Sequence, residues 1–486
     1  QKFYLYMNLT KPEEFLHISY SKVSSDGKTL RPAYLVWDLK KLFPKLVVTE
    51  EEALLMTQRE LTPGEGLEFV IRGVRDRYLG VDESWKELYT WYRQNEGQKV
   101  DRILDAGFFK KKPDALTGEE AAELYGEKKQ FSVTRMERFS ACAYAHFLTY
   151  GLHLSDRERY EFEAMDLGNI AHQSMERFAR KAQEKRMPWP KLEEVQRDAM
   201  IEESVEESIK DYGNTVLYST ARNEYMIVRI KQLIRRSVWA LTRQMEKGDF
   251  EPSGYEMNFG SGKIDRVDTC EDEDMVYVKV TDYKTGMKSF DIVALYHGLQ
   301  MQLPVYLNAA LELEERRAPG KTVEPAGIFY YRIKDPIVDR EKDDHALEEK
   351  ILKELRLDGM INAKEEVIEH LEHQLSGTSV LNPIGKNKDG SLNRYSKVLP
   401  PEAFAAMLSY TKKKEAQVKR QIYAGEVQAN PYELNGSTGC DYCAYRDICG
   451  FDPRLDGYAY RSLEKYSKEE VIRRMEEEIE NREEPS

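Results

Sequence analysis

The chain has 486 residues, a formal net charge of −13 and a sequence pI near 5.4, and it contains five cysteines. This length allows two or more domains, and the acidic balance excludes a generic nucleic-acid coat, although an enzyme needs only a local basic groove. Few cysteines, no signal peptide and no membrane-spanning apolar run exclude a secreted disulfide framework and predict a soluble, cytoplasmic protein. The first residue is Gln1, so we expect a piece of a longer protein or a processed product.

The first 127 residues fall into two parts. Residues 1–48 contain three apolar runs, FYLYMNLT, FLHISYS and AYLVWDL, which predict strands. A GKT triplet begins at Gly27, but a phosphate-binding P-loop needs a glycine where this chain has Lys22. Residues 49–127 are polar, and we expect them to form a mostly helical connecting region.

Helical patterns begin at Ser132, a plausible N-cap for the segment SVTRMERFSACAYAHFLTYGL. The segment DLGNIAHQSMERFARKAQEK places Gly168 and His172 on one helical face, and a long amphipathic helix is predicted over 223–247. The period then changes to two. GYEMNFG, GKIDRVD and MVYVKVTDYKTG predict successive strands, with residues 271–274 at a hairpin tip.

The last third of the chain alternates again. HGLQMQLPVYLNAALELEE predicts a helix with Pro304 in its first turn, and AGIFYYRI predicts a strand. Further helices are predicted over 345–357 and 401–424, before a cysteine-rich loop and a charged helical tail.

Several polar residues in these segments form a candidate metal-dependent site. Asp282 and Lys284 are two apart on a strand, so their side chains leave the same face. Asp265 ends the neighbouring strand, with Asp268 as its alternative, and a helical His172 completes the cluster. Two carboxylates and an imidazole suit Mg²⁺ or Mn²⁺. Glu256 is an alternative ligand.

The segments LGNIAH, GKIDRVD, VTDYKTG and QLPVY resemble, in this order, the motifs of the RecB-type nuclease family within the PD-(D/E)XK superfamily. The resemblance implies an α/β fold whose core is a mixed sheet flanked by helices. It also implies that His172, Asp265 and Asp282 bind the metal and that Lys284 is the catalytic lysine. Gln302 and Tyr306 would form the supporting Q-x3-Y motif.

The other cysteines indicate a second metal site. Cys440, Cys443 and Cys449 form a C-x2-C-x5-C run, which needs a fourth ligand. Cys270 lies beside four acidic residues, whose charge raises the pKa of a thiol, whereas Cys142 lies among apolar and aromatic residues. We therefore expect Cys142 to be the fourth ligand and Cys270 to be a free thiol. On spacing alone, zinc is an alternative to iron and sulfur.

One remote cysteine plus this run, around a RecB-type nuclease, resembles the AddB family, the iron–sulfur subunits of bacterial AddAB helicase–nucleases. That resemblance implies a structural 4Fe–4S cluster. The segment LYMNLTKPEEFLHISYS also resembles the last motif of superfamily 1 helicases. It has Thr10-Lys11 where motors have Thr-Arg, which implies a non-motor remnant.

Together these resemblances imply a Mg²⁺-dependent DNA exonuclease that cuts the 5′-ended strand while double-strand breaks are processed for homologous recombination. Its substrate would be a single strand from an unwound duplex end, and its partner an AddA-like subunit in a heterodimer. The alternatives are a stand-alone iron–sulfur exonuclease and a DNA-end-binding scaffold with an inactive site. The expected domains are a helicase-like remnant, a helical connecting region, an iron–sulfur nuclease domain and a tail, at residues 1–48, 49–127, 128–457 and 458–486.

Overall fold

A computed structural model describes residues 2–24, 27–50, 62–75, 80, 83–110, 115–126, 131–155, 164–212, 220–260, 262–341 and 343–480. The chain divides into two compact units, residues 1–109 and 110–486. None of the helices in the described ranges combines the length and the apolar character that crossing a bilayer requires.

The first unit is helical where it is described. Its helices are α1 (Lys2–Leu9), α2 (Tyr34–Leu42), α3 (Pro63–Arg75), α4 (Glu83–Asn95) and α5 (Gly97–Gly107). Helices α3 to α5 pack around a small core of Val70, Tyr92 and Val100. The helical character expected for residues 49–127 is therefore confirmed over the described part of that range.

The strands expected within residues 1–48 are wrong. Helices α1 and α2 occupy most of the first and third apolar runs, and the second run has no regular structure. Short apolar runs do not distinguish a strand from a helix, since neither period is established over so few residues. Phe3, Tyr4 and Tyr34 are exposed, so no neighbouring strand buries a face of these runs.

The second unit is built on a six-stranded sheet. Its strands, in spatial order, are β1 (Glu251–Phe259), β2 (Gly262–Glu271), β3 (Met275–Lys284), β4 (Thr322–Arg332), β5 (Asp358–Asn362) and β6 (Val398–Leu399). The β3–β4 and β5–β6 pairs are parallel and the other pairs are antiparallel. The predicted mixed sheet and the hairpin between β2 and β3 are therefore confirmed.

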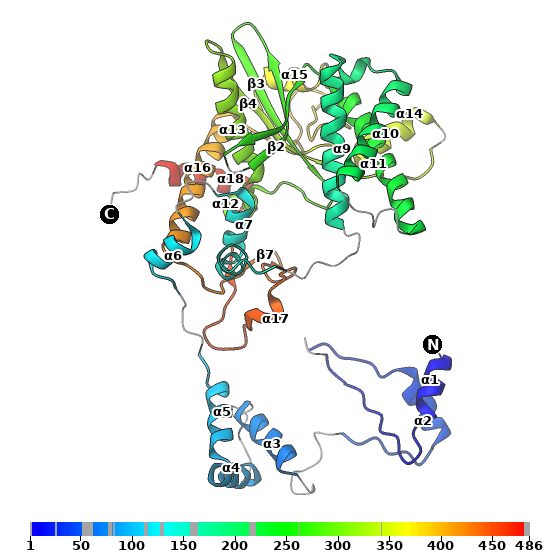
Figure 1. The fold of residues 1–486 in the computed structure, drawn as a ribbon, viewed down its shortest axis with the longest axis vertical. Helices are drawn as coiled ribbons and strands as arrows, with labels where there is room; N and C mark the ends of the chain where they lie inside the picture. The colour runs from blue at the N-terminus through cyan, green and yellow to red at the C-terminus, as the bar shows by residue number, and fades with distance from the viewer. Residues whose placement is uncertain are drawn as a thin grey trace. The chain divides into compact units, whose positions relative to one another are not determined.

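Helices cover both faces of this sheet, as Figure 1 shows. One face is covered by α9 (Ala164–Glu184), α10 (Glu194–Asp211) and α11 (Ala221–Met245). The other face is covered by α7 (Val133–Ala141), α13 (Gln302–Arg317) and α16 (Pro401–Tyr423). The α/β class with a helix-flanked sheet follows directly.

Strand alternation assigns each side chain of β3 to one of these two layers. Val276, Val278 and Val280 belong to the core beneath α13, whereas Tyr277 and Tyr283 belong to the core beneath α9. Successive strand residues point to opposite faces, so the residues that follow Val280 in the same phase face α13. This phase places the predicted polar pair of β3 beside the first turn of α13.

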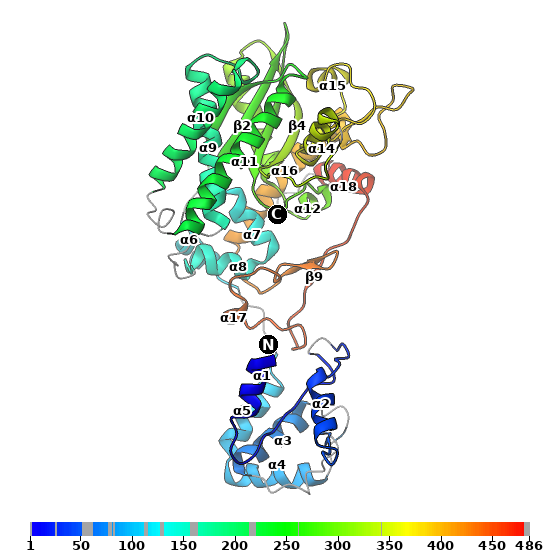
Figure 2. The same cartoon turned by 90° about the vertical axis from the view of Figure 1, so that its right-hand side faces the viewer.

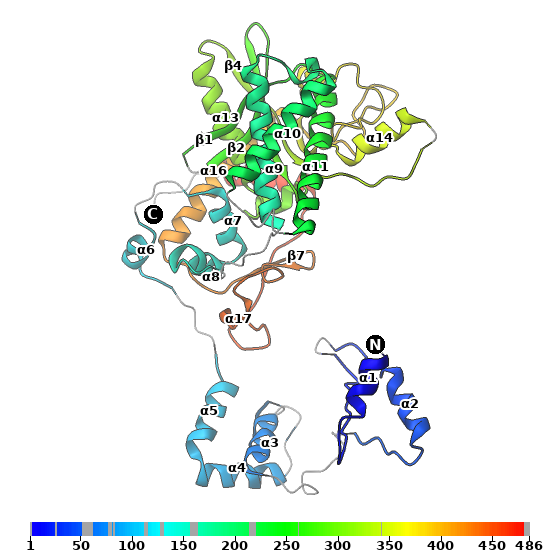
Figure 3. The same cartoon turned by 45° about the vertical axis from the view of Figure 1, so that its right-hand side comes forward.

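Shorter elements complete the unit. They are α6 (Gly118–Tyr125), α8 (Ala143–His146), the π-helix η4 (Phe147–Gly151), the 3₁₀-helix η5 (Trp189–Lys191), α12 (Ile292–Tyr296), α14 (Asp344–Glu354), α15 (Glu365–Leu371), α17 (Arg446–Cys449), β7 (Tyr432–Leu434), β8 (Ser437–Thr438) and β9 (Arg461–Ser462). The last three strands form a second sheet in the order β8-β7-β9. Figure 3 shows β7 and α17 on the same side of the unit as α8.

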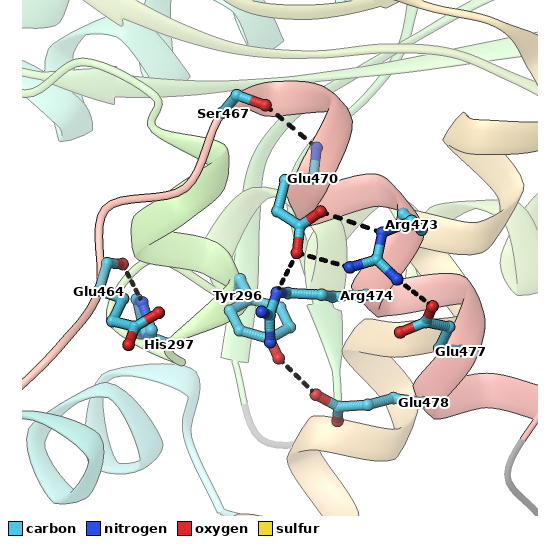
Figure 4. A network of polar contacts seen from close by, with 9 residues as sticks. All are labelled: Tyr296, His297, Glu464, Ser467, Glu470, Arg473, Arg474, Glu477 and Glu478. Carbon is cyan, nitrogen blue, oxygen red and sulfur yellow. Dashed lines mark hydrogen bonds and ion pairs between the residues drawn. The ribbon is translucent and has the colours of Figure 1, made fainter.

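The C-terminal helix α18 (Lys468–Glu480) packs into the second unit against α16 and α12 (Figure 2). Val471 and Met475 are fully buried in the core beneath α13. On α12, the Tyr296 hydroxyl donates a hydrogen bond of 2.7 Å to Glu478 (Figure 4). Helix α6, which lies within the expected connecting region, also belongs to this unit, and the division between units falls at 109 and 110.

Buried His146 makes the stability of this unit sensitive to acid. Its Nε2 accepts a hydrogen bond of 3.0 Å from Arg135 Nε, and burial together with the Arg135 charge lowers the pKa of His146 to about 3. The unfolded state therefore binds a proton below pH 6.5 that the folded state refuses, so stability falls as the pH decreases from about 6.5 to about 3. We expect His146→Gln, which keeps an acceptor but does not titrate, to remove about 2 kcal/mol of the stability lost between pH 7 and pH 5. Urea unfolding at both pH values measures this, and equal losses in both proteins would contradict it.

Candidate active site

The candidate site lies where strands β2 and β3 separate. Arg266 and Thr281 form the last pair of the β2–β3 ladder toward this end. Asp265 and Asp282 are the next residues on the two strands. The Asp265 carboxylate takes the place of a ladder partner, because its Oδ2 accepts a hydrogen bond of 2.7 Å from the backbone N–H of Tyr283. The end of the ladder therefore brings two carboxylates to one place.

Asp282 is almost fully buried and has one carboxylate oxygen without a hydrogen bond. Its Oδ1 accepts a bond of 2.8 Å from Gln302 Nε2. Its Oδ2 has no hydrogen-bond partner among the described residues, and Lys284 Nζ lies 2.5 Å from it as an ion-pair partner. Burial and the charge of Asp265 raise the pKa of Asp282 to about 7, although Lys284 opposes the shift. Such a carboxylate is suited to a cation that neutralises it.

Gln302 and Tyr306 orient Asp282 from the first turns of α13. Gln302 Nε2 donates to Asp282 and also lies 2.9 Å from the Tyr306 hydroxyl oxygen, to which it donates a second bond. With both amide hydrogens engaged, the side chain has a defined orientation. The i, i+4 spacing that the sequence shows thus forms a contact between the two side chains and reaches Asp282.

His172 approaches from α9. Its Nδ1 lies 3.2 Å from Asp265 Oδ2, and both side chains are partly buried. Burial lowers the pKa of His172, but the hydrogen bond and charge of Asp265, together with the charge of Asp282, outweigh it, so the pKa is raised. Gly168 lies one turn earlier, where an added Cβ would lie 3.2 Å from Thr285 Oγ1, so a glycine allows α9 to approach the end of β3 closely.

Glu256 on β1 also reaches this site. Ligand atoms of His172, Asp265 and Glu256 all lie within 4.8 Å of one another. Burial and the charge of Asp265 raise the pKa of Glu256. The backbone of Glu256 has a φ of 46°, which is unusual for a non-glycine residue and places the residue at an irregularity of the strand.

The choice between Asp265 and Asp268 is answered by their surroundings. Asp268 is fully buried and forms ion pairs with Arg266 Nε at 2.6 Å and with Lys279 Nζ at 3.6 Å. Both partners are cationic, so this carboxylate is neutralised within the fold. Asp265 has His172 and Glu256 beside it instead, and it is the residue that faces Asp282.

Two residues of this neighbourhood were not singled out by sequence reasoning. Glu137 on α7 accepts hydrogen bonds from the backbone N–H groups of Met301 and Gln302. Lys288 lies in the loop after β3 and contacts the ring of Tyr330. Nothing in the spacing of Glu137 pointed to α13, which is 164 residues away along the chain.

The four cysteines expected to share a metal line one cavity of about 220 Å³, formed by α7, α8 and the loop 439–454. Burial raises the pKa of Cys440, and the charges of Cys142, Cys443 and Cys449 add to the shift. Four mutually close thiols that are costly to ionise are a donor set that fits a multiply charged metal centre.

Cys142 reaches this cavity because the helix is interrupted there. It ends α7 and precedes α8 with an extended backbone, at φ −167° and ψ 120°. The break leaves the N–H of Ala143 free to donate a bond of 2.9 Å to Asn430 Oδ1. Gly439 lies close to the same break, where an added Cβ would lie 2.9 Å from the Ala141 carbonyl oxygen.

Cys270 lies elsewhere, in a polar group with Asp249 and His370. Both ring nitrogens of His370 are already engaged, Nδ1 with Asp249 at 2.8 Å and Nε2 with Asp272 at 3.2 Å. Burial and the surrounding carboxylates raise the pKa of Cys270 to about 12.

This pKa predicts an unreactive thiol at Cys270. Only the thiolate is nucleophilic, and at pH 8 about one part in 10⁴ of this group is ionised. We expect iodoacetamide at pH 8 to leave Cys270 unmodified in the folded protein and to alkylate it fully in urea. Peptide mass spectrometry measures both, and equal rates in the two states would contradict the expectation.

The mixed sheet, the carboxylate pair at its splayed hairpin and the adjacent lysine are features of one nuclease class, and the chain belongs to it. The model of the PD-(D/E)XK nuclease superfamily matches residues 130–450.

Similar proteins carry one name. The chain is 37% identical, over 97% of its length, to the ATP-dependent helicase/deoxyribonuclease B subunit of Lachnoclostridium phytofermentans. It is 32% identical to the proteins of that name from Alkaliphilus oremlandii and Caldanaerobacter subterraneus, over 99% and 97% of its length. It covers 42%, 44% and 43% of these three relatives, which is less than half of each. The resemblance to the AddB family is thereby confirmed.

Proposed function

We propose that this chain is the nuclease part of a helicase–nuclease subunit and hydrolyses DNA phosphodiester bonds with Mg²⁺, or with Mn²⁺ in its place. The observation that carries the proposal is the buried Asp282, whose Oδ2 accepts no hydrogen bond and lies beside Asp265 and Lys284. A carboxylate held with a raised pKa next to a second carboxylate is costly unless a cation occupies the site.

Asp265, Asp282 and His172 would hold the ion, and Glu256 is within reach of the same position. When bound, the metal supplies an activated water and neutralises charge on the phosphoryl group. Lys284 contributes a fixed positive charge where negative charge develops on the phosphoryl oxygens. Gln302 occupies Asp282 Oδ1 and so leaves Oδ2 available. Tyr306 accepts from the same amide and holds it in that orientation.

Anaerobically purified protein on single-stranded DNA labelled at either end tests this activity. We expect cleavage with Mg²⁺ or Mn²⁺ and none with EDTA, with products that show degradation of the 5′-ended strand. Cleavage that persists in EDTA would contradict a metal-dependent mechanism. Binding without cleavage in any metal would favour a scaffold.

For the cysteine cavity we propose a structural 4Fe–4S cluster bound by Cys142, Cys440, Cys443 and Cys449. All four thiols line one cavity, and the fourth cysteine comes from a helix break 298 residues before the loop. The expected composition is about four iron and four sulfide per chain. One zinc per chain and no sulfide would overturn the proposal in favour of a zinc site.

For the whole protein we propose a heterodimer with an AddA-like subunit that processes double-strand break ends for homologous recombination. The names of the relatives, which join a helicase and a deoxyribonuclease in one subunit, support this. Residues 1–48 would be the remnant of the helicase-like region, and 128–457 the nuclease domain. Co-expression of the full-length protein with such a subunit should yield a stable one-to-one complex.

A further inference from the structure

The first turn of α13 needs a cap that it does not supply itself. The N-cap residue Met301 has no polar side-chain oxygen, and Pro304 has no N–H to offer. The backbone N–H groups of Met301 and Gln302 both donate to one oxygen, Oε1 of Glu137, at 2.7 and 3.0 Å. The turn that presents Gln302 to Asp282 is thus capped by a carboxylate from another helix.

The position of Glu137 suits this role electrostatically. A negative group at a helix N-terminus interacts favourably with the aligned peptide dipoles. Burial raises the pKa of Glu137, while the charges of Lys288 and Lys284 and the two backbone hydrogen bonds oppose the shift. The carboxylate is therefore part of the same electrostatic neighbourhood as the candidate catalytic lysine.

The same helix is held at its other end by the cysteine site. Helix α7 ends at Cys142, five residues after Glu137. Near that end, the Arg461 guanidinium donates to the carbonyl oxygen of Ser140, and Asn430 accepts from Ala143. Helix α7 therefore connects the cysteine cavity directly to the first turn of α13.

We propose that Glu137 is a positioning residue that fixes the first turn of α13, so that Gln302 orients Asp282, and that links this turn through α7 to the cysteine site. The inference rests on the proposed nuclease function for its consequence but not for its geometry. Glu137 acts as a hydrogen-bond acceptor; it does not itself contact the reacting groups.

The test compares Glu137→Ala, which removes the acceptor, with Glu137→Gln, which keeps a carbonyl oxygen in its place. We expect the alanine variant to lower kcat roughly 10- to 100-fold, the effect of a small displacement of a catalytic group, with KM for DNA unchanged. The glutamine variant should recover kcat to within about threefold. In a Gln302→Ala background, Glu137→Ala should cause little further loss, because both changes release the same contact.

Hydrogen exchange gives a readout that does not depend on activity. We expect the backbone amides of Met301 and Gln302 to exchange at least about tenfold faster in Glu137→Ala and in Cys142→Ser, but not in Glu137→Gln. Inactive wild-type protein would contradict the proposed function, and the exchange rates would still decide the role of Glu137. Unchanged exchange in Glu137→Ala, or a glutamine variant as impaired as the alanine variant, would overturn the inference.

Discussion

Replacing Asp282 by asparagine should reduce DNA cleavage by at least about 10³-fold, the size of effect typical of removing one group that stabilises transition-state charge. The substitution keeps the volume and an acceptor for Gln302, but it removes the negative charge that would bind a cation. Ionised Asp282 is costly because it is buried beside Asp265, so its loss should not lower the melting temperature of the metal-free protein. Initial rates on end-labelled single-stranded DNA at saturating Mg²⁺ measure the effect.

The matched control for this variant is Asp389→Asn. Asp389 is exposed in the loop 387–391, where its carboxylate accepts hydrogen bonds from Ser391. We expect wild-type rates from it. Activity of Asp282→Asn within tenfold of wild type would place the chemistry elsewhere.

Replacing Cys142 by serine should destabilise the second unit and remove its iron. A cross-link between Cys142 and the loop at Cys440 closes 298 residues, which corresponds to roughly 5 kcal/mol of chain entropy. A loss of that size lowers the melting temperature by about 10 °C or more in a unit of this length. Direct contacts such as the bond from Ala143 to Asn430 still join α8 to the segment 428–432 after the cluster is lost. Calorimetry together with iron analysis of the same samples measures the effect.

Cys270→Ala is the control for Cys142→Ser. Cys270 is 5% exposed and lies outside the cavity that the other four cysteines line. Its replacement should keep the iron content and cost no more than about 1 kcal/mol. Equal losses of stability and iron in the two variants would contradict the assignment of the fourth ligand.

The part of the site carried by β3 and α13 follows from sequence periodicity. Asp282 and Lys284 share a strand face because the side-chain period is two, and Gln302 and Tyr306 meet because residues four apart share a helix face. Both contacts are present, and they link through Gln302 to Asp282. The sheet order and the hairpin at 272–274 follow from the same patterns.

Other features depend on tertiary contacts that no local pattern contains. Asp265 and Asp268 are three apart and therefore face opposite ways, but only the buried Arg266 and Lys279 identify which face holds the site. The extended break at Cys142 lies inside a segment with a continuous helical pattern.

The N-terminal apolar runs and Glu137 show the same limit. The runs around Phe3 and Tyr34 carry apolar side chains without the sheet that would favour strands, and they form helices. Glu137 reads as an ordinary helix residue until α13 is placed beside it.

Divalent metal binding at the splayed hairpin is the central claim, and titration of free Mn²⁺ by electron paramagnetic resonance tests it most directly. The cluster-loaded protein should remove Mn²⁺ from solution in a stoichiometry that also distinguishes one ion from two. Asp265→Asn and Asp282→Asn should each lose that binding, and Asp389→Asn should keep it. Mn²⁺ binding that is equally strong in all four proteins would contradict the assignment of the metal site to Asp265 and Asp282.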